Sequence, residues 1–555
     1  MKIKKTEKEL LLELEDLKAE NKKLKKTKKF GLVWEDKPEK FEQDSINALP
    51  ILKEKGGKFK DIISDKENDF NILIEGDNYH SLSVLNYTHR GKIDVIYIDP
   101  PYNTGNKDFI YNDNYVDKED CFRHSKWLSF MSKRLRLAKN LLKNNGVIFI
   151  SIDDNEVANL KKICDEIFGE NNFVGDFIWQ KQGNDDKSIF SGVKTFRNDH
   201  EFIVTYSKNR SLLEFERPEE KAKFKNDYGN TDNDPRGNWM SAELGKSDAR
   251  SISHGKNYYT LTTPNGTKWT RQWHYNKNEI NLLINDNKIY FGKEGSSVPR
   301  LKRFLSETTR KIPSSILTKQ GSTKTGQLEL NNIFSGQKVF PYPKPSTLIK
   351  YLTTLSKNKN LLILDFFAGS GTTGHAILDL NKKDAGKRKF ILCTNNENKI
   401  CEDITWERIK KISKGYRKTD NEEIAGLGGN LKYFKTGFIE IDKVTDNLRN
   451  KMVGSSTEIL CLKENTFNLK KDQYKEINTK IFENSNKYTA ILFDLFYFDD
   501  FVEELKKLTD KPVSVYVFSY TKDFSKEEFG DLNIDFTIEA IPEKVLETYK
   551  KIFNF

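Results

Sequence analysis

The sequence predicts an α/β protein built on a doubly wound, mostly parallel sheet. Three apolar runs, over residues 71–74, 93–98 and 147–152, are typical of strands buried on both faces, and segments with helical spacing separate them. The same alternation returns at residues 361–366 and 390–394. Because strands and helices alternate in both parts of the chain, we expect helices on both faces of one sheet.

The first part of this sheet is expected within residues 30–181. Its first strand ends at Glu75-Gly76-Asp77-Asn78, and its second strand ends at Asp99. Apolar residues at helical spacing predict helices over 120–143 and 156–168, before and after the third strand. Ligands of open α/β sheets bind outside the carboxyl ends of the strands, so these strand ends are candidate site positions.

A segment of different composition, residues 182–335, interrupts the alternation. It is rich in Gly, Asn, Asp, Ser and Lys, and aromatic residues are interleaved with them. The turn Thr263-Pro264-Asn265-Gly266-Thr267 between two β-type runs predicts a hairpin. We interpret the segment as an inserted recognition domain. A lid that makes no contact with nucleic acid is the alternative.

The α/β pattern resumes in residues 336–425. It predicts a helix over 346–355, a strand over 361–366, a helix over 372–380 and a strand over 390–394. Glycines at 426, 428 and 429 mark a boundary, and we expect a small C-terminal α/β domain over 426–555. Its predicted elements are strands over 489–493 and 513–518 and helices over 499–509 and 542–553.

The first 29 residues predict a charged helix with a heptad seam. Ile3, Leu10, Leu17 and Leu24 belong to this seam, which also contains the polar Glu7 and Asn21. A buried seam asparagine fixes register in coiled coils, so we expect self-association, most simply as a homodimer. A lone amphipathic helix packed on its own domain is the alternative.

Composition limits the class of protein. The formal net charge of +11 fits a polyanionic partner such as nucleic acid, and it fits a lysine-rich solvated surface about equally well. The five cysteines are scattered, and the histidines have no ligand spacing, so neither a metal site nor a disulfide framework is expected. No apolar leader or membrane span is evident, which predicts a cytoplasmic protein.

Asp99-Pro100-Pro101-Tyr102 follows the second predicted strand and is suited to holding a flat aminated base. The prolines make a stiff extended turn, in which the Asp99 carboxylate and the Pro100 carbonyl are two acceptors. An exocyclic amino group donates two hydrogens, so paired acceptors match it. The Tyr102 ring can stack on a base that has been flipped out of a duplex. An ordinary proline turn after a strand is the alternative.

Asp365-Phe366-Phe367-Ala368-Gly369-Ser370-Gly371 follows a later strand and is suited to a nucleoside-type cofactor. Its glycines let a ligand approach the backbone, and the next helix begins with free N–H groups. The run from Gly369 nearly matches a phosphate-binding loop, but His375 stands where that loop requires lysine. A nucleoside with an amino-acid carboxylate therefore fits better than a nucleoside triphosphate. A plain strand-to-helix turn is the alternative.

Together these motifs resemble the β-class DNA amino-methyltransferases, in which Asp-Pro-Pro-Tyr precedes Phe-x-Gly-x-Gly. Further matches resemble the modification subunits of Type III restriction–modification systems. They are Gly31-Leu32-Val33-Trp34-Glu35, Glu75-Gly76-Asp77-Asn78, Leu328-Glu329-Leu330-Asn331-Asn332-Ile333-Phe334 and Phe340-Pro341-Tyr342-Pro343-Lys344-Pro345. The resemblance implies the S-adenosylmethionine-dependent methyltransferase fold in permuted motif order, with residues 182–335 as its target-recognition domain.

The resemblance also implies site residues. Asp99, Pro100, Pro101 and Tyr102 would be catalytic. The S-adenosylmethionine site would comprise Asp77, Asn78, Asp365, Phe367, Ala368, Gly369, Gly371, Thr372 and Asn395. The chain departs from the family pattern at Thr394-Asn395-Asn396-Glu397, where an acidic residue commonly binds the cofactor ribose.

The implied reaction is methylation of adenine N6 in double-stranded DNA by direct in-line displacement on a flipped-out base. Catalysis would then rest on positioning and electrostatics. A Type III restriction subunit with ATP-dependent helicase and nuclease activity is the implied partner. The alternatives are N4-cytosine methylation, a methyltransferase–nuclease fusion, and a non-catalytic DNA-binding scaffold for a restriction subunit.

Overall fold

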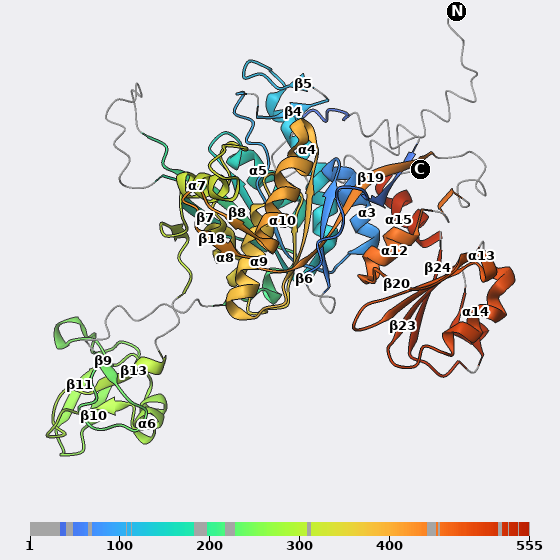
Figure 1. The fold of residues 1–555 in the computed structure, drawn as a ribbon. Helices are drawn as coiled ribbons and strands as arrows, with labels where there is room; N and C mark the ends of the chain where they lie inside the picture. Colours follow the sequence, from blue (N-terminus) through green and yellow to red (C-terminus); the bar gives the residue numbers. More distant parts are fainter. Residues whose placement is uncertain are drawn as a thin grey trace, which may run out of the picture. The chain divides into compact units, whose positions relative to one another are not determined.

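A computed structural model describes most of the chain. The described residues are 34–39, 48–64, 69–106, 108–112, 114–182, 197–216, 228–307, 312–440, 451–452, 455–519, 524–530, 532–541 and 543–553. They fall into two compact units, Phe215–Ser314 and the remainder of the chain on either side of it (Figure 1). The helix predicted over 1–29 lies outside the described residues.

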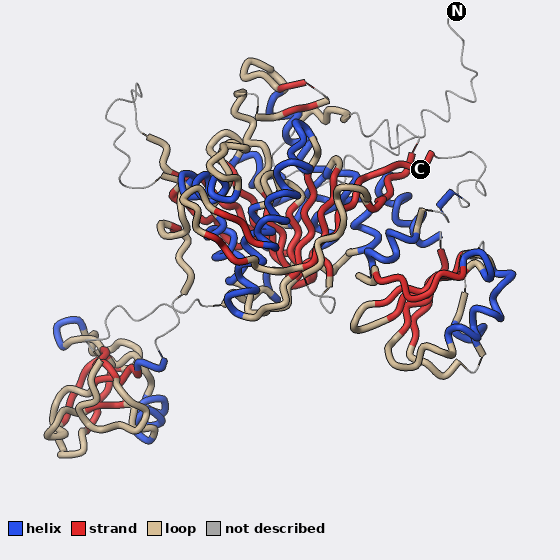
Figure 2. Tube along the Cα trace, in the orientation of Figure 1, coloured by secondary structure: helices blue, strands red, loops and turns tan. Residues whose placement is uncertain are grey.

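A ten-stranded sheet forms the centre of the larger unit, which confirms the predicted fold class (Figures 1 and 2). Its middle six strands are mutually parallel, while β1 and β8 pair antiparallel with their neighbours. In spatial order the strands are β1 (Ala48–Glu54), β19 (Asn430–Glu440), β2 (Phe70–Glu75), β16 (Lys389–Thr394), β15 (Leu362–Asp365), β3 (Ile93–Ile98), β6 (Leu142–Ile152), β8 (His200–Ser207), β7 (Phe173–Gln180) and β14 (Ile316–Leu317).

The connections of the sheet run in two opposite directions. From β2 the chain passes through α3 (Asn78–Thr88) to β3 and through α4 (Arg123–Leu141) to β6. From β15 it passes the other way, through α9 (Thr372–Asp384) to β16 and then through α10 (Glu407–Lys414) to β19. Because such crossovers are right-handed, the two helix groups cover opposite faces. The strand order therefore switches direction between β15 and β3.

The helices are held to the sheet by an apolar core. Ile96 and Ile98 on β3, Ile148 on β6 and Leu364 on β15 are fully buried, as is Trp127 on α4. Two more helices extend the groups: α5 (Val157–Phe168) packs on α4, and α8 (Ser346–Thr354) packs on α9. This packing fixes the carboxyl ends of β3 and β15 beside each other.

The smaller unit, Phe215–Ser314, contains the predicted hairpin. Its two strands, β10 (Tyr258–Thr262) and β11 (Lys268–Gln272), pair antiparallel, and the Thr263 N–H donates to the Thr267 carbonyl at 2.9 Å across the turn. A small core of Leu244, Leu261, Trp273, Ile280, Ile289 and Leu301 holds it together. Its other elements are β9 (Trp239–Glu243), α6 (Lys277–Asn285), β12 (Ile289–Tyr290) and β13 (Arg300–Phe304).

This unit is narrower than the inserted domain expected over residues 182–335. The run from His200 to Ser207 forms β8, a buried strand of the large sheet, and β14 at Ile316–Leu317 pairs with β7. After β14 the chain forms α7 (Thr323–Ile333), which packs on α10. Apolar strand residues on both sides of the insertion thus belong to the large sheet.

The boundary expected at residue 425 is corrected by the structure. Residues Asn430–Glu440 form β19, which lies inside the large sheet between β1 and β2. Lys432 on this strand is buried because Glu54 and Asp61 accept hydrogen bonds from its ammonium at 2.8 Å and 2.7 Å. A lysine that disrupts the apolar pattern is therefore compatible with an interior strand.

The C-terminal residues of the larger unit form a five-stranded sheet and helices that pack on α3. The Tyr87 hydroxyl donates to Glu539 at 2.7 Å, and the buried Tyr549 hydroxyl donates to the Pro50 carbonyl at 2.6 Å. The elements are α12 (Thr457–Glu464), β20 (Asn468–Gln473), β21 (Thr479–Glu483), β22 (Tyr488–Leu492), α14 (Phe498–Leu505), β23 (Val513–Phe518), β24 (Phe536–Ile541) and α15 (Glu543–Phe553).

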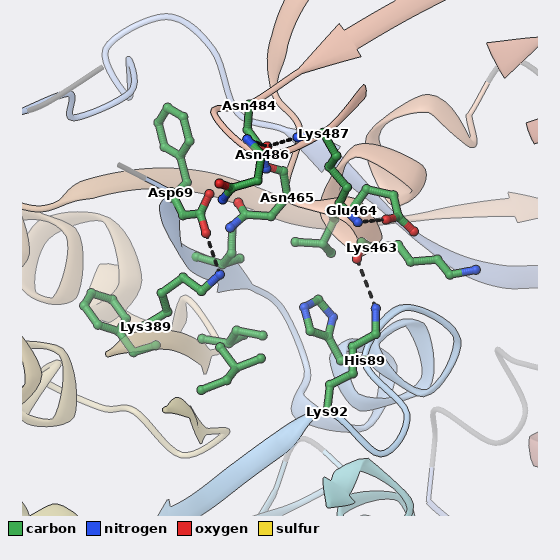
Figure 3. A pocket seen from close by; sticks show the side chains of 16 residues that line it. Asp69, His89, Lys92, Lys389, Lys463, Glu464, Asn465, Asn484, Asn486 and Lys487 are labelled. Carbon is green, nitrogen blue, oxygen red and sulfur yellow. Dashed lines mark hydrogen bonds and ion pairs between the residues drawn. The ribbon is translucent and has the colours of Figure 1, made fainter. Parts of the chain in front are cut away.

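A polar cavity of about 260 Å³ lies at the amino ends of β2, β15 and β16, where the C-terminal sheet approaches them (Figure 3). Lys389 pairs with Asp69 at 2.8 Å, and Lys92 donates to the Lys463 carbonyl at 3.1 Å. The carboxyl ends of the same strands lie at the opposite edge of the sheet.

No described helix is long and apolar enough to cross a membrane.

Candidate active site

The turn Asp99-Pro100-Pro101-Tyr102 directly follows β3, as predicted. The fully buried Trp127 of α4 donates its indole N–H to the Pro101 carbonyl at 2.7 Å. Asn103, next in the chain, has a positive φ of 58° and donates to Glu156 at 2.5 Å. These contacts hold the turn from behind. Among the described residues, none donates a hydrogen bond to the Pro100 carbonyl, which is free to accept one.

Asp99 belongs to a cluster of four polar side chains, which we call the Asp99 cluster: Asp99, Tyr102, Glu201 and Lys344. The Lys344 ammonium lies 2.9 Å from each Asp99 oxygen. The Tyr102 hydroxyl donates to Asp99 at 2.8 Å and lies 3.0 Å from Glu201. The Asp99 side chain is 28% exposed, so part of its carboxylate still faces solvent.

The surroundings of the cluster shift the pKa values of Lys344, Tyr102 and Glu201. Burial lowers the pKa of Lys344, but the carboxylates of Asp99 and Glu201 outweigh burial and raise it above its usual value. Burial and the same two carboxylates raise the pKa of Tyr102. Burial tends to raise the pKa of Glu201, but the positive charges of Lys344 and Lys181 together lower it more strongly. The pKa of Glu201 is therefore below its usual value. At neutral pH, Lys344 is therefore a cation, Glu201 an anion and Tyr102 a neutral hydroxyl.

The glycine turn after β15 lies beside the Asp99 turn. Register pairs Ile363 with Val95 and Leu364 with Ile96, so the two strands end at the same edge of the sheet. Gly369 and Gly371 have φ values of 49° and 78°, which disfavour any side chain. A Cβ on Gly369 would also come within 3.4 Å of the Phe340 ring. The turn thus passes close to an aromatic ring at Gly369.

Residues after β16 support the glycine turn. The Thr405 hydroxyl donates to the Gly369 carbonyl at 2.6 Å. The buried Arg408 donates to the Ser370 carbonyl at 3.3 Å and to the Thr372 hydroxyl at 2.8 Å. His375 lies 3.1 Å from Arg408, and burial followed by that guanidinium holds its pKa well below the usual range. His375 is therefore a neutral group behind the turn.

Asp365 shapes the turn from within. Its carboxylate accepts from the Phe367 N–H at 3.0 Å and from the Thr373 hydroxyl, and the residue is buried. Burial raises the pKa of Asp365 to about 7. Ala368, also in the turn, donates its N–H to the Cys393 carbonyl at 3.1 Å, which ties the turn to β16. Thr372 opens α9, whose N-cap, Gly371, provides no side-chain cap.

Asp77 and Asn78 lie at the end of β2 and are organised by Arg134 of α4. The Arg134 guanidinium is 3.3 Å from Asp77 and also donates to Asn78, while Glu39 accepts from it at 3.0 Å. Asn78 in turn donates to the Phe366 carbonyl at 3.2 Å. The Asp77 side chain remains 42% exposed. Hydrogen bonds thus connect the ends of β2 and β15.

Among the described residues directly after β16, no carboxylate contacts the glycine turn. Asn395 is exposed, and Asn396 accepts from the Glu402 N–H at 3.2 Å. Asn398 and Lys399 both have positive φ, and a π-helical turn (Ile400–Trp406) follows. Among the described residues, none forms a cluster of acidic, cysteine or histidine side chains suited to a metal ion.

Four residues of this region went unassigned by sequence reasoning: Arg134, Glu201, Lys344 and Arg408. Glu201 was detectable as a charge at the start of an otherwise apolar run, and Lys344 lay within a motif noted for its family resemblance. Their partners are distant in sequence, as Lys344 and Asp99 are 245 residues apart. Local spacing carries no signal for such contacts.

Comparison with known proteins indicates a family for this chain. A family model described as DNA methylase matches residues 93–414. The chain is 37% identical over 379 residues to the Type III restriction-modification enzyme StyLTI Mod subunit of Salmonella typhimurium, covering 63% of this chain and 57% of that protein. It is 35% identical over 386 residues to the EcoPI Mod subunit of Escherichia phage P1, covering 60% of this chain and 58% of that protein.

A further relative is the Type II methyltransferase M.KpnI of Klebsiella pneumoniae. The identity is 33% over 409 residues, covering 68% of this chain and 93% of M.KpnI. The match to the two Mod subunits therefore spans less than two thirds of their length, whereas the match to M.KpnI spans nearly all of it.

Proposed function

The chain belongs to the DNA methylase family, and on that premise we propose that it transfers a methyl group from S-adenosylmethionine to the N6 amino group of adenine in double-stranded DNA. The observation that supports this most directly is the meeting of two turns where the strand order switches direction. A turn with two acceptors and an aromatic ring follows β3, and a glycine turn follows β15. Ligands of open α/β sheets bind at such switch points.

In the proposed reaction, Asp99 and the Pro100 carbonyl accept the two hydrogens of the amino group. Tyr102 stacks on the base, which must leave the duplex to reach a strand end. Pro101 fixes the turn through its contact with Trp127. The four residues thereby orient the nitrogen for in-line attack, and such positioning supplies much of the rate enhancement in transfer reactions.

The residues at the glycine turn fit S-adenosylmethionine. Positive φ at Gly369 and Gly371 favours glycine at both positions, a residue that lets a ligand approach the backbone closely, and the start of α9 at Thr372 has no side-chain cap. The half-exposed carboxylate of Asp77 is an acceptor suited to the adenosine amino group. When bound, the cofactor supplies a methyl group that its sulfonium activates. The proposed contacts further include Asn78, Phe367, Ala368 and Asn395, while Asp365 acts by shaping the turn.

The choice of adenine rests on the family resemblance, in which aspartate at the first position of the motif favours adenine over cytosine. Cytosine N4 also presents an exocyclic amine, so the same acceptors would suit it. The proposed partners are double-stranded DNA, a second copy of the chain and a Type III restriction subunit. The proposed site of action is the cytoplasm, and the unit Phe215–Ser314 is proposed to read the target sequence.

The match to M.KpnI favours a second candidate: a methyltransferase that acts without a restriction partner. Nearly the whole of that Type II methyltransferase aligns with this chain. Affinity purification of the tagged chain from its own cells separates the two candidates. Stoichiometric recovery of an ATP-dependent helicase–nuclease supports the Type III assignment, and recovery of an active chain alone supports the second candidate.

One experiment tests the proposed reaction. Unmethylated DNA is incubated with the purified chain and S-adenosylmethionine, and modified bases are then mapped by sequencing and identified by mass spectrometry. N6-methyladenine within one recurring sequence is the expected product. N4-methylcytosine would overturn the base assignment, and unmodified DNA would overturn the proposed function.

A further inference from the structure

Lys344 lies between two carboxylates that come from separate parts of the sheet. Its ammonium is 2.9 Å from Asp99, after β3, and 3.2 Å from Glu201, on β8. Lys344 itself precedes α8. Its side chain is only 11% exposed, as is that of Glu201. Lys344 and Glu201 are thus held together with little access to water, while the Asp99 carboxylate remains partly exposed.

The two carboxylates are also linked through Tyr102. Its hydroxyl lies 2.8 Å from Asp99 and 3.0 Å from Glu201, and Lys344 donates to it at 2.8 Å. One phenolic hydrogen serves one carboxylate at a time. Two carboxylates at such proximity repel each other, and without a cation one of them takes up a proton more readily.

Other charged groups near the pair cannot replace Lys344. Lys181 is 3.6 Å from Glu201 on the side away from the Asp99 contacts, and no described contact joins it to Asp99. Asp153, Asp365 and Tyr97 also interact electrostatically with one or both of the two carboxylates, and none of these three groups is a cation. Among the described residues, Lys344 is therefore the one cation bonded to Asp99.

We propose that Lys344 is a positioning residue for methyl transfer, whose ammonium allows Asp99 and Glu201 to be ionised together so that Asp99 accepts the hydrogens of the target amino group. This inference rests on the proposed function of the site. Its chemical basis is simple: an ionised carboxylate only accepts hydrogen bonds, whereas a protonated one also donates. A protonated Asp99 would present a hydrogen to an amino group that needs an acceptor.

In this arrangement the Glu201 carboxylate repels that of Asp99, and the Lys344 ammonium offsets the repulsion. Lys344→Met should leave two facing carboxylates that share a proton near neutral pH. Methyl transfer would then fail at low pH and recover at higher pH, where both groups ionise. Adding Glu201→Gln removes the second charge, so the double variant should recover activity that the single variant has lost.

The test is the pH dependence of single-turnover methyl transfer, measured with saturating cofactor and DNA. We expect Lys344→Met to move the acidic limb of the profile upward by about one pH unit or more, the usual effect of a like charge without a counterion. Lys344→Met/Glu201→Gln should return the limb toward the wild-type position. Lys181→Met is the matched control, because it removes a lysine near Glu201 that has no described contact with Asp99, and its limb should move less.

Two results would overturn the proposal. One is a Lys344→Met profile with the wild-type limb and only a lower plateau, which indicates a purely structural role. The other is a double variant whose limb lies as high as that of the single variant. If Lys344→Met does not fold, the Glu201→Gln variant provides the test. The acidic limb of its pH profile should not move to higher pH, because Lys344 still neutralises Asp99. A movement of that limb to higher pH would refute the charge balance.

Thermal unfolding separates failure of this inference from failure of the proposed function. If wild-type protein transfers no methyl group at any pH, the proposed function falls while the charge balance stays testable. Lys344→Met should then lower the unfolding temperature more at pH 8 than at pH 5.5, and Glu201→Gln should restore it. Equal losses at both pH values would refute the balance on its own.

Discussion

Thr405 donates its hydroxyl hydrogen to the Gly369 carbonyl at 2.6 Å, so the π-helical turn after β16 directly supports the glycine turn after β15. We expect Thr405→Val to weaken S-adenosylmethionine binding about fivefold, because one lost hydrogen bond costs about 1 kcal/mol. Isothermal titration calorimetry measures the change. Thr405→Ser keeps the hydroxyl and should bind as the wild type does, and equal weakening in both variants would contradict a role for the bond.

Asp99→Ala should reduce methyl transfer by at least about 10²-fold, the usual cost of removing a group that orients or stabilises the reacting atoms. Cofactor binding should persist, because Asp99 makes no described contact with the glycine turn. Single-turnover assays and calorimetry on one preparation provide both measurements. Equal loss of transfer and cofactor affinity would show that Asp99 does not have the assigned role.

Asp365 should make stability depend on pH. Its pKa is about 7 in the folded protein, against about 3.9 in an unfolded chain. The folded state therefore holds a proton that the unfolded state has released, so this contribution is full below about pH 4 and is lost as pH rises to about 7. Asp365→Asn removes the titration. Its unfolding temperature relative to the wild type should accordingly rise across this window.

Asp403→Asn is the control for that measurement, because Asp403 is an exposed carboxylate in the π-helical turn. Differential scanning calorimetry at several pH values follows both variants. If the difference in unfolding temperature between Asp365→Asn and the wild type stays constant from pH 4 to 8, then Asp365 is ionised throughout that range.

Tyr549→Phe should destabilise the packing of the C-terminal residues on the large sheet. The lost hydroxyl leaves the buried Pro50 carbonyl without its donor, at a cost of about 1–3 kcal/mol. The melting temperature should fall. Tyr474→Phe, which alters an exposed ring in the short helix Tyr474–Ile477 of the C-terminal residues, should leave the melting temperature unchanged. Equal effects would show that the Pro50 contact adds no stability.

The main architecture was predictable because its strands are apolar throughout and end at turns with chemical character. Ile93–Ile98 before Asp99 and Leu362–Asp365 before the glycine turn were recognisable for that reason. The strand β19 was missed because Lys432 breaks its apolar run, and only the distant Glu54 and Asp61 make that lysine compatible with burial. Charge pairing between remote segments leaves no local pattern.

The candidate site likewise contains some residues that the local sequence predicts and others that it does not. Asp99 and Tyr102 were predicted as site residues from the chemistry of one short turn, whereas Glu201 and Lys344, which contact them in the folded protein, were not predicted. Their function depends on distances set by three separate chain segments, and only the folded sheet defines those. The family resemblance placed Asp365 in the cofactor site, but both of its oxygens accept hydrogen bonds from within the turn.

The unit Phe215–Ser314 leaves the chain after β8 and returns before β14, so it interrupts no strand of the parallel centre. Recombination in the connecting segments would exchange one such unit for another while every residue at the ends of β3 and β15 stays in place. On the proposed role of this unit in target recognition, such an exchange would change the DNA sequence that is recognised and leave the proposed catalytic residues unchanged.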